Sequence, residues 1–484
     1  MKIKLTSILL IFTFLATSGF KCKNTIDPEV ALKMQPIELN YWKVWDDTDA
    51  LQGLIGEYQA LHPNIKINYR KLEYSEYERE LIEAFATDRG PDIFSIHNTW
   101  TRKYQGKNLI SPMPTTITTI IPTVTGSVKK DVEYKKVTTK FSTTKLKTDF
   151  IDVVYNDVVI RTKDAETQQY SEGIYGLPLF VDTLALYYNK NLFNNAGIST
   201  PPEYWDREFQ QDVKKLTKQN NKGEIIQAGV AMGGGNNIDR STDILSALMM
   251  QNGTVMMSDQ QTIMFHTTPP DFKDKNFNPG LDALRFYSDF ANPAKEVYSW
   301  NNTLDNSLNL FIQGKLAMMF GYAYMLPQIK ANAPKLNFAI SKLPQIPENN
   351  QTINFANYWV EAVSNKILTN PENLKQGSDY ARVKQEAAWD FIRFISQKTE
   401  VQKYLAKVKK PTALREIIND QIDDPDIGIF AGQALTAKSW YKGADANAAE
   451  TIIKEMIDDV QEIQASQLPE ILSLSAAKVQ QTIK

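Results

Sequence analysis

The chain has 484 residues, and its 54 Lys and Arg against 56 Asp and Glu give a formal net charge of −2. This balance excludes the basic excess typical of nucleic-acid-binding proteins, so we expect no nucleic-acid partner. The apolar fraction of 42% and the length predict a packed globular protein of roughly two to three domains. One cysteine and three histidines argue against a disulfide framework and a Cys/His metal site, so we expect no metal and no cofactor.

Residues 1–21 have the pattern of a secretory signal peptide. Lys2 and Lys4 precede a short apolar run at 8–16, and small residues follow it. The run is shorter than the about 20 residues that a comfortable transmembrane helix needs. An uncleaved N-terminal anchor remains the alternative interpretation of the same segment.

Cys22 stands just after this run, where bacterial lipoproteins carry their lipidated cysteine. Phe20 and Lys21 depart from the usual motif, which has an aliphatic residue three before the cysteine and a small one directly before it. The position nevertheless predicts a lipid anchor on Cys22 and a membrane-anchored, extracytoplasmic protein. Without lipidation the protein would be periplasmic. Residues 22–36, which are polar and aperiodic, are expected to form a tether.

Strand and helix patterns alternate from residue 37 to residue 96. Apolar periodicity predicts strands at 37–42, 65–69 and 92–96 and helices at 48–61 and 74–87. This order predicts βαβ units and a parallel sheet. Ligands of such sheets lie beyond the carboxyl ends of the strands, which here means residues 43–47 and 97–100.

Residues 112–148 are rich in Thr, Ile, Val and Lys and differ from their surroundings. They are interpreted as a surface insertion of irregular strands, or else as a basic flap for a membrane, cell wall or anionic ligand. Beyond them, periodicity predicts further strands at 184–188, 225–232, 315–320, 336–343 and 360–363. Helices are predicted at 208–218, 242–251, 281–290, 304–313, 386–396, 451–463 and 469–483.

Signatures of catalysis are sparse. We find no P-loop, no G-x-S-x-G elbow and no H-E-x-x-H motif. Glycines 233–235 follow a strand and could cradle a phosphate, but turn chemistry explains them equally well. The adjacent Asp46 and Asp47 could serve a glycosidase only if facing carboxylates were shown. We therefore expect a protein that is not an enzyme.

Aromatic residues gather beside polar ones at the predicted strand ends. Flat rings cover the apolar faces of sugars, and carboxylates or amides bind their hydroxyl groups. Core packing is the alternative role for any single ring. As a set, these residues favour contact with a sugar: Trp42, Trp45, Trp100, Tyr322, Tyr324, Tyr358, Trp359, Trp440 and Tyr441.

From residue 37 onward the chain resembles the family 1 extracellular solute-binding proteins, the maltose- and oligosaccharide-type receptors of ABC importers. Four stretches carry the resemblance: Leu39–Trp42 with His62–Ile67; Gly90–Ile93; Tyr175–Pro178 with Leu186–Phe193 and Ala196–Pro202; and Phe311–Met318 with Ala388–Ile395. The resemblance implies an α/β fold of two periplasmic-binding-protein-like lobes, each a mostly parallel sheet flanked by helices, with solute in the hinge cleft.

The resemblance also implies the division of the chain. Crossings between the lobes are expected at 178–186, at 336–343 and near 408–414. Lobe one would then comprise residues 37–182 and 343–408, and lobe two residues 183–342 and 409–484.

The family's contact positions, carried over one by one, imply these ligand-binding residues: Trp42, Lys43, Trp45, Asp46, Asp47, His97, Asn98, Trp100, Asp182, Asn236, Asn237, Arg240, Tyr322, Tyr358, Trp359 and Trp440. The implied partners are a small solute, most simply a neutral sugar, and the membrane subunits of an ABC importer. Arg240 and the Lys-rich insertion leave an anionic solute open. A monomer is expected. A sensor or scaffold lipoprotein without an importer and a carbohydrate-active enzyme remain alternative functions.

Overall fold

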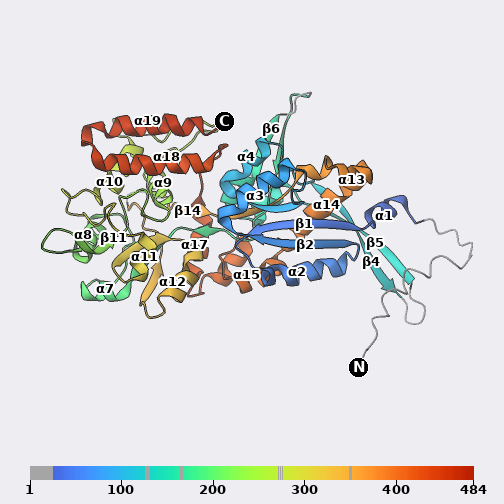
Figure 1. Ribbon diagram of the computed structural model, residues 1–484, viewed down its shortest axis with the longest axis horizontal. Coiled ribbons are helices and arrows are strands. Elements are labelled where there is room, and N and C mark those ends of the chain that lie inside the picture. The colour runs from blue at the N-terminus through green and yellow to red at the C-terminus, as the bar shows by residue number, and fades with distance from the viewer. Residues whose placement is uncertain are drawn as a thin grey trace, which may run out of the picture.

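The computed structural model describes residues 26–125, 131–163, 167–270, 272, 274, 276–347 and 351–484. The predicted signal peptide and Cys22, the predicted lipidation site, lie outside the described residues. Two bodies lie side by side along the long axis of the molecule (Figure 1), and each has its own hydrophobic core. Lobe one buries side chains from 37–181 and 356–437, and lobe two from 184–355 and 440–483, with Phe430. The predicted two-lobe α/β fold is confirmed.

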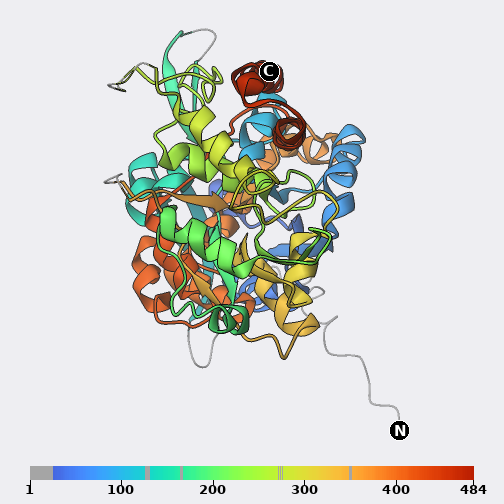
Figure 2. The same ribbon diagram turned by 90° about the vertical axis from the view of Figure 1, so that its left-hand side faces the viewer.

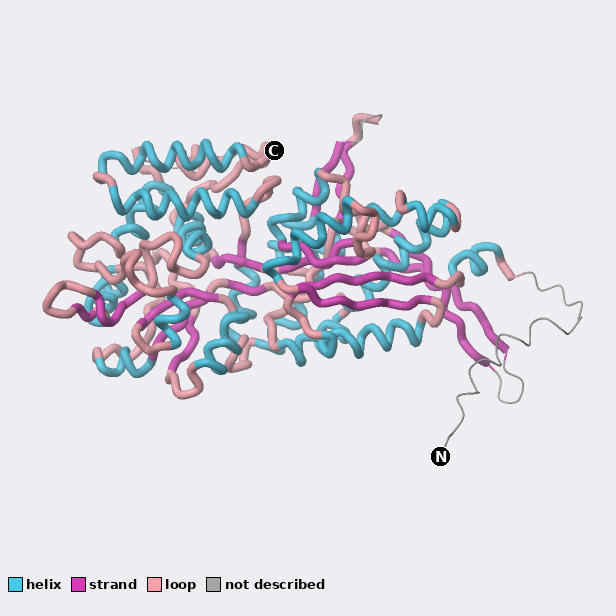
Figure 3. The backbone as a smooth tube through the Cα atoms, in the orientation of Figure 1, coloured by secondary structure: helices cyan, strands magenta, loops and turns pink. Residues whose placement is uncertain are grey.

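Lobe one is built on a four-stranded sheet in the order β15-β3-β1-β2. β1 (Ile37–Val44) pairs in parallel with β2 (Ile65–Leu72) and β3 (Ile93–His97), and β15 (Trp359–Val363) runs antiparallel to β3. Figure 3 shows these long strands lying with one end toward lobe two. The carboxyl ends of the parallel strands β1, β2 and β3 meet that lobe, whereas the antiparallel β15 runs away from it.

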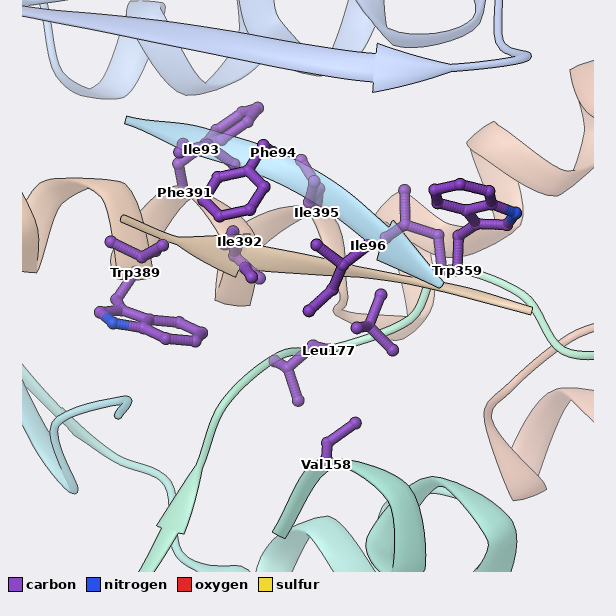
Figure 4. Close-up of a cluster of buried hydrophobic side chains, with 14 of the residues drawn as sticks. Ile93, Phe94, Ile96, Val158, Leu177, Trp359, Trp389, Phe391, Ile392 and Ile395 are labelled. Carbon is purple, nitrogen blue, oxygen red and sulfur yellow. The ribbon is translucent and has the colours of Figure 1, made fainter. Parts of the chain in front are cut away.

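Helices on the sheet close the core of lobe one. α2 (Thr48–Leu61) buries Leu51, Leu54, Ile55 and Tyr58 on one face and ends before His62–Pro63, because a residue before proline disfavours helix. Figure 4 shows α14 (Ser378–Ile395) packing Phe391 and its neighbours against side chains of β3. The lobe also contains α3 (Tyr74–Ala86), α4 (Thr101–Gly106), α5 (Thr143–Asp149), α6 (Asp152–Val158), α13 (Pro371–Lys375), α15 (Lys398–Val408) and α16 (Ile418–Gln421). α17 (Gly428–Gln433) follows in the chain but buries Phe430 in the core of lobe two.

Lobe two has a five-stranded mixed sheet in the order β10-β11-β12-β9-β13. The strands are β9 (Ala185–Asn189), β10 (Lys218–Gln219), β11 (Ile225–Val230), β12 (Leu316–Gly321) and β13 (Phe338–Ser341). Only β11 and β12 pair in parallel among the described residues, which differs from the mostly parallel sheet expected. The reason is that β9 enters directly from the crossing and pairs antiparallel with both β12 and β13.

The helices of lobe two include the C-terminal pair α18 (Ala446–Asp459) and α19 (Leu468–Gln481), which lie along one edge of the lobe (Figures 1 and 2). The others are α7 (Lys190–Asn195), α8 (Arg207–Leu216), α9 (Ser241–Gln251), α10 (Pro279–Asp289), α11 (Ser307–Ile312) and α12 (Leu326–Asn332).

Three short strands form a separate sheet between the lobes, in the order β16-β14-β8. They are β8 (Asp182–Thr183), β14 (Asn354–Asn357) and β16 (Ala437–Lys438). β8 falls within the range 178–186 expected for the first crossing, whereas β14 and β16 come after the ranges 336–343 and 408–414. Leu343 and Ile353 still pack in lobe two, and Ala413 and Leu414 pack in lobe one, so the buried side chains group differently from the predicted domain ranges at 343–355 and 409–437.

The insertion forms a regular hairpin rather than irregular strands. β4 (Thr116–Thr125) pairs with β5 (Asp131–Lys140) in continuous antiparallel register from Thr116↔Lys140 to Thr125↔Asp131.

The segment expected to be a tether contains α1 (Pro28–Lys33), and Lys33 Nζ donates to Thr118 O at 2.8 Å and to Glu386 Oε2 at 2.6 Å. A second hairpin joins β6 (Val159–Lys163) and β7 (Tyr170–Ile174). Within the described ranges, no helix has the length and apolar character that would let it cross a membrane.

Candidate functional site

A cavity of about 90 Å³ lies where the carboxyl ends of the lobe-one strands meet lobe two. We call it the inter-lobe cavity. Five of the residues predicted to bind ligand line it together: His97, Asn98, Trp100, Arg240 and Trp440. These five residues come from three segments that meet at the cavity: the end of β3, the loop before α9 and the loop after β16.

The lobe-one wall follows directly from the end of β3. His97 Nε2 lies 3.1 Å from Asn357 Oδ1 and Nδ1 lies 2.8 Å from Thr99 Oγ1, and burial lowers the pKa of His97, so its ring is neutral at physiological pH. Asn98 Nδ2 donates to Asp157 Oδ2 at 2.9 Å, while Asn98 Oδ1 has no partner among the described residues. A buried acceptor without a partner is costly, so this oxygen suits a hydroxyl donor on a ligand.

Opposite this wall, Arg240 presents a fixed charge from lobe two. Its Nε and Nη2 donate to the two oxygens of Asp243, each at 2.9 Å, and Glu450 Oε2 lies 3.7 Å from Nη1. Burial alone would lower the pKa of Arg240, but Asp243 and Glu450 raise it well above its usual value. Tyr322, which is fully buried, donates its hydroxyl to Asp243 Oδ2 at 2.6 Å, so it orients the pair instead of lining the cavity.

Each lobe also exposes an aromatic ring near the inter-lobe cavity, although neither Trp45 nor Tyr324 is part of its lining. On lobe one, Trp45 is 51% exposed and stacks on Tyr74, with ring centroids 5.1 Å apart. On lobe two, Tyr324 is 52% exposed and stacks on Tyr322 at 6.0 Å. Trp45 has a φ of 74°, a left-handed conformation that costs a bulky residue roughly 1–2 kcal/mol. Strain that holds a large ring in solvent points to a functional surface.

Two of the strand-end charges turn inward and form a buried network instead. Lys43 pairs with Glu361 and lies 3.4 Å from Asp46 Oδ2, and all three side chains are almost completely buried. Asp46 also accepts hydrogen bonds from Tyr404 and Lys410, both at 2.7 Å. Burial alone would lower the pKa of Lys43 and raise that of Asp46, but the opposite charges reverse both shifts. Neither residue lines the inter-lobe cavity.

The other predicted contacts also have partners within the protein. On lobe one, the Arg70 guanidinium lies over the ring of Trp42, Asp47 forms an ion pair with Lys71, Tyr358 donates to Asp157, and Trp359 packs edge-on against His97 and Trp100. On lobe two, Asn236 donates to Asp458. Asn237 accepts a hydrogen bond from Trp300 and donates to two loop carbonyls. Asp182, at the first crossing, accepts the backbone N–H groups of Thr183, Ala323 and Tyr324. None of these seven side chains lines the inter-lobe cavity.

Several cavity residues lie outside the sequence prediction. Tyr74 opens α3 just after β2, so the strand-end rule that selected residues 97–100 could have found it. Asp243 lies in the first turn of α9, three positions after Arg240, which directly precedes that helix. Asn447 and Glu450 come from α18, and no local pattern connects that helix to the sheet of lobe one. Among the described residues, no group of His, Cys, Asp and Glu has an arrangement able to hold a metal ion.

Several proteins similar to this chain in sequence or in structure are named as binding proteins. A maltotriose-binding protein from Pyrococcus abyssi is 22% identical over 438 residues, which cover 88% of this chain and 76% of that protein. A binding protein from Brucella abortus is 31% identical over 180 residues, and the match spans only 36% of this chain and 38% of the relative. An ABC substrate-binding protein from Listeria monocytogenes, solved in complex with cycloalternan, has a TM-score of 0.65 at 17% identity and covers 93% of this chain and 99% of its own.

The structural likeness shows a shared fold, and the family follows from the sequence itself. Residues 45–402, most of the chain, match the family described as bacterial extracellular solute-binding protein. The matched range includes three of the four strands of the lobe-one sheet, the whole sheet of lobe two and the first two crossings, and it begins one residue after β1. The chain therefore belongs to the bacterial extracellular solute-binding protein family.

Proposed function

We propose that the protein is an extracytoplasmic receptor that captures a sugar or short oligosaccharide between its lobes and delivers it to an ABC importer. The observation that carries this proposal is the pairing of solvent-exposed aromatic rings with fixed polar groups around one cavity. Trp45, Tyr74 and Tyr324 offer flat apolar faces, and Asn98 and Arg240 offer hydrogen-bonding groups. Sugars require both kinds of contact. The relatives named for maltotriose and cycloalternan support the same ligand class.

The proposed mechanism is capture by closure, without bond chemistry. A cavity of about 90 Å³ is smaller than the roughly 300–1,000 Å³ of typical small-molecule sites, so a saccharide enters when the lobes separate. Asn447 Nδ2 donates to Glu78 Oε2 at 3.2 Å across the lobes, a contact that opening would break. The three-stranded sheet of β8, β14 and β16 is the natural hinge. Closure is favoured when the solute contacts both lobes at once.

The proposed ligand contacts are the residues whose side chains line the cavity or stand exposed beside it: Trp45, Tyr74, His97, Asn98, Trp100, Arg240, Tyr324, Trp440 and Glu450. Lys43, Asp46 and Asp182 are proposed to act indirectly, by holding the backbone that carries these contacts in place.

We further propose that Cys22 carries a lipid that holds the receptor at the membrane beside the importer. A fatty-acid probe should label the wild type in cells and leave Cys22→Ala unlabelled.

Replacing Trp45 by Ala should weaken saccharide binding by about tenfold or more, because an exposed stacking ring is lost. The unfolding midpoint should change little, since the ring is half in solvent. A thermal-shift screen of mono- and oligosaccharides, including the maltodextrin series, first identifies the ligand, because binding raises apparent stability. Calorimetry then compares its affinity for the variants.

Tyr170→Ala is the matched control, because Tyr170 is an aromatic residue 58% exposed on the β6–β7 hairpin, outside the inter-lobe cavity. It should bind as the wild type does. If Trp45→Ala kept full affinity for every saccharide that binds the wild type, the aromatic wall of lobe one would have no part in binding.

A further inference from the structure

A second cavity, of about 450 Å³, lies on the other side of Trp440 from the inter-lobe cavity. Ser439 and Trp440 line both cavities. The second one is bounded by the loop after α9, around Thr254, by the start of α4, and by the segment from β16 to Lys442. We call it the rear cavity.

Positive charge dominates the rear cavity. Arg102, Lys438 and Lys442 line it, and Asp259, which is exposed, is its one acidic lining residue among those described. The side chains of Arg102 and Lys438 are half-buried and have no hydrogen bond or ion pair with any described residue, and burial lowers the pKa of both groups. Lys442 Nζ donates to a backbone carbonyl, that of Asn156, at 2.8 Å, and so keeps its charge unneutralised.

Lys and Arg side chains are almost never fully buried without an opposite charge, since removing an ammonium or guanidinium group from water is costly. An anion in the rear cavity would offset this cost for the partly buried Arg102 and Lys438. Asp157 is the nearest acidic influence on Arg102, but its two oxygens already accept hydrogen bonds from Asn98, Tyr358 and Ser439. The lining also includes Thr254, which is 6% exposed and whose hydroxyl has no partner in the described part of the chain.

We propose that the rear cavity binds an oxyanion, that is, a carboxylate, sulfate or phosphate group. Arg102 supplies a planar set of N–H donors, Lys438 and Lys442 supply ammonium groups, and Thr254 supplies a neutral hydroxyl donor after a small rotation. These are the donors that bind oxyanions most strongly. The anion is either a free ion from solution or the acidic substituent of a saccharide. The rear cavity is distinct from the inter-lobe cavity, so each source of the anion can be tested alone.

The test compares sulfate, phosphate and glucuronate with neutral glucose, by calorimetry at constant ionic strength kept with NaCl. At least one oxyanion should bind the wild type, and Arg102→Gln/Lys438→Gln should bind it more than about tenfold more weakly. Lys66→Gln/Arg79→Gln is the control, because it removes the same charge from an exposed surface of lobe one and should keep wild-type affinity. Binding of sulfate or phosphate would indicate a free ion, and binding of glucuronate alone an acidic saccharide.

An NMR titration of the wild type gives a second readout that does not depend on how the variant folds. Sulfate or glucuronate should shift the backbone amides of Thr254 and Lys442 before that of Asn98 in the inter-lobe cavity. The proposal is overturned if none of the three oxyanions binds, if both charge variants lose affinity equally, or if the shifts centre on Asn98. Saccharide capture would stand in each of these cases, because its test uses neutral sugars and Trp45.

Discussion

Replacing Lys43 by Met should lower the free energy of unfolding by about 3–5 kcal/mol, because the change leaves the buried carboxylate of Glu361 without its cation, while Asp46 keeps its ion pair with Lys410. Lys43 is 1% exposed and stands between Glu361 on β15 and Asp46 after β1. Without it, the carboxylate of Glu361 retains the hydrogen bond from Ser95 Oγ, at 2.7 Å. Urea denaturation followed by circular dichroism measures the loss.

Lys71→Met is the matched control. Lys71 is the register partner of Lys43 on the neighbouring strand, and its ion pair with Asp47, at 2.8 Å, is in solvent. Its removal should cost no more than about 1 kcal/mol. Lys43→Met/Glu361→Met should recover part of the loss, since it removes the unpaired charge along with its partner. Equal stabilities for Lys43→Met and Lys71→Met would show that the inner pair contributes no more than a surface pair.

The elements of lobe one follow closely from local pattern. The predicted helix at 48–61 has the bounds of α2, because apolar residues recur on one face and His62–Pro63 prevents another turn. β1, β2 and α3 likewise begin at the predicted residues. The order of strands could be inferred as well, since short crossover helices leave few arrangements of a parallel sheet.

The features that could not be predicted from the sequence, the regular hairpin and the later crossings, depend on pairing between distant segments. Thr116 to Thr125 is dense in β-branched residues, but whether such a run forms a regular hairpin depends on its partner strand, Asp131 to Lys140. The crossings depend in the same way on distant residues. β14 pairs with β8 and β16, which lie far from it in the chain. No periodicity within residues 354–357 indicates that they cross between the lobes.

The residues of the candidate site also differ in whether local sequence or distant pairing decides their position. The rule that ligands meet the carboxyl ends of parallel strands found His97, Asn98 and Trp100, which line the inter-lobe cavity. It could not tell that Lys43 points into the lobe, because a strand end has two faces and the buried partner, Glu361, comes from a strand much later in the chain. Only the folded protein pairs them.

The stability of the protein should also depend on the ionisation of Asp182. This carboxyl group is buried at the first crossing, where Oδ1 accepts the N–H groups of Thr183 and Ala323 at 2.9 and 3.0 Å and Oδ2 accepts that of Tyr324 at 3.3 Å. Burial raises its pKa to about 7, although these three donors favour the charged form. An unfolded aspartate has a pKa of about 3.9. The folded state therefore holds an extra proton between about pH 4 and pH 7, and stability is lost as pH rises through this window.

Asp182→Asn should remove this pH dependence, because the amide has the shape of the protonated acid and does not titrate. Relative to the variant, the wild type should lose roughly 1.4 kcal/mol of unfolding free energy per pH unit between pH 5 and pH 6.5. Urea unfolding at several pH values in that range measures the slope difference. Asp47→Asn, which makes the same change on an exposed side chain, should keep the wild-type slope. Parallel slopes for the wild type and Asp182→Asn would mean that the three N–H groups keep the folded carboxylate charged, and that the contact between the crossing and the Tyr324 loop is an ionic one throughout this range.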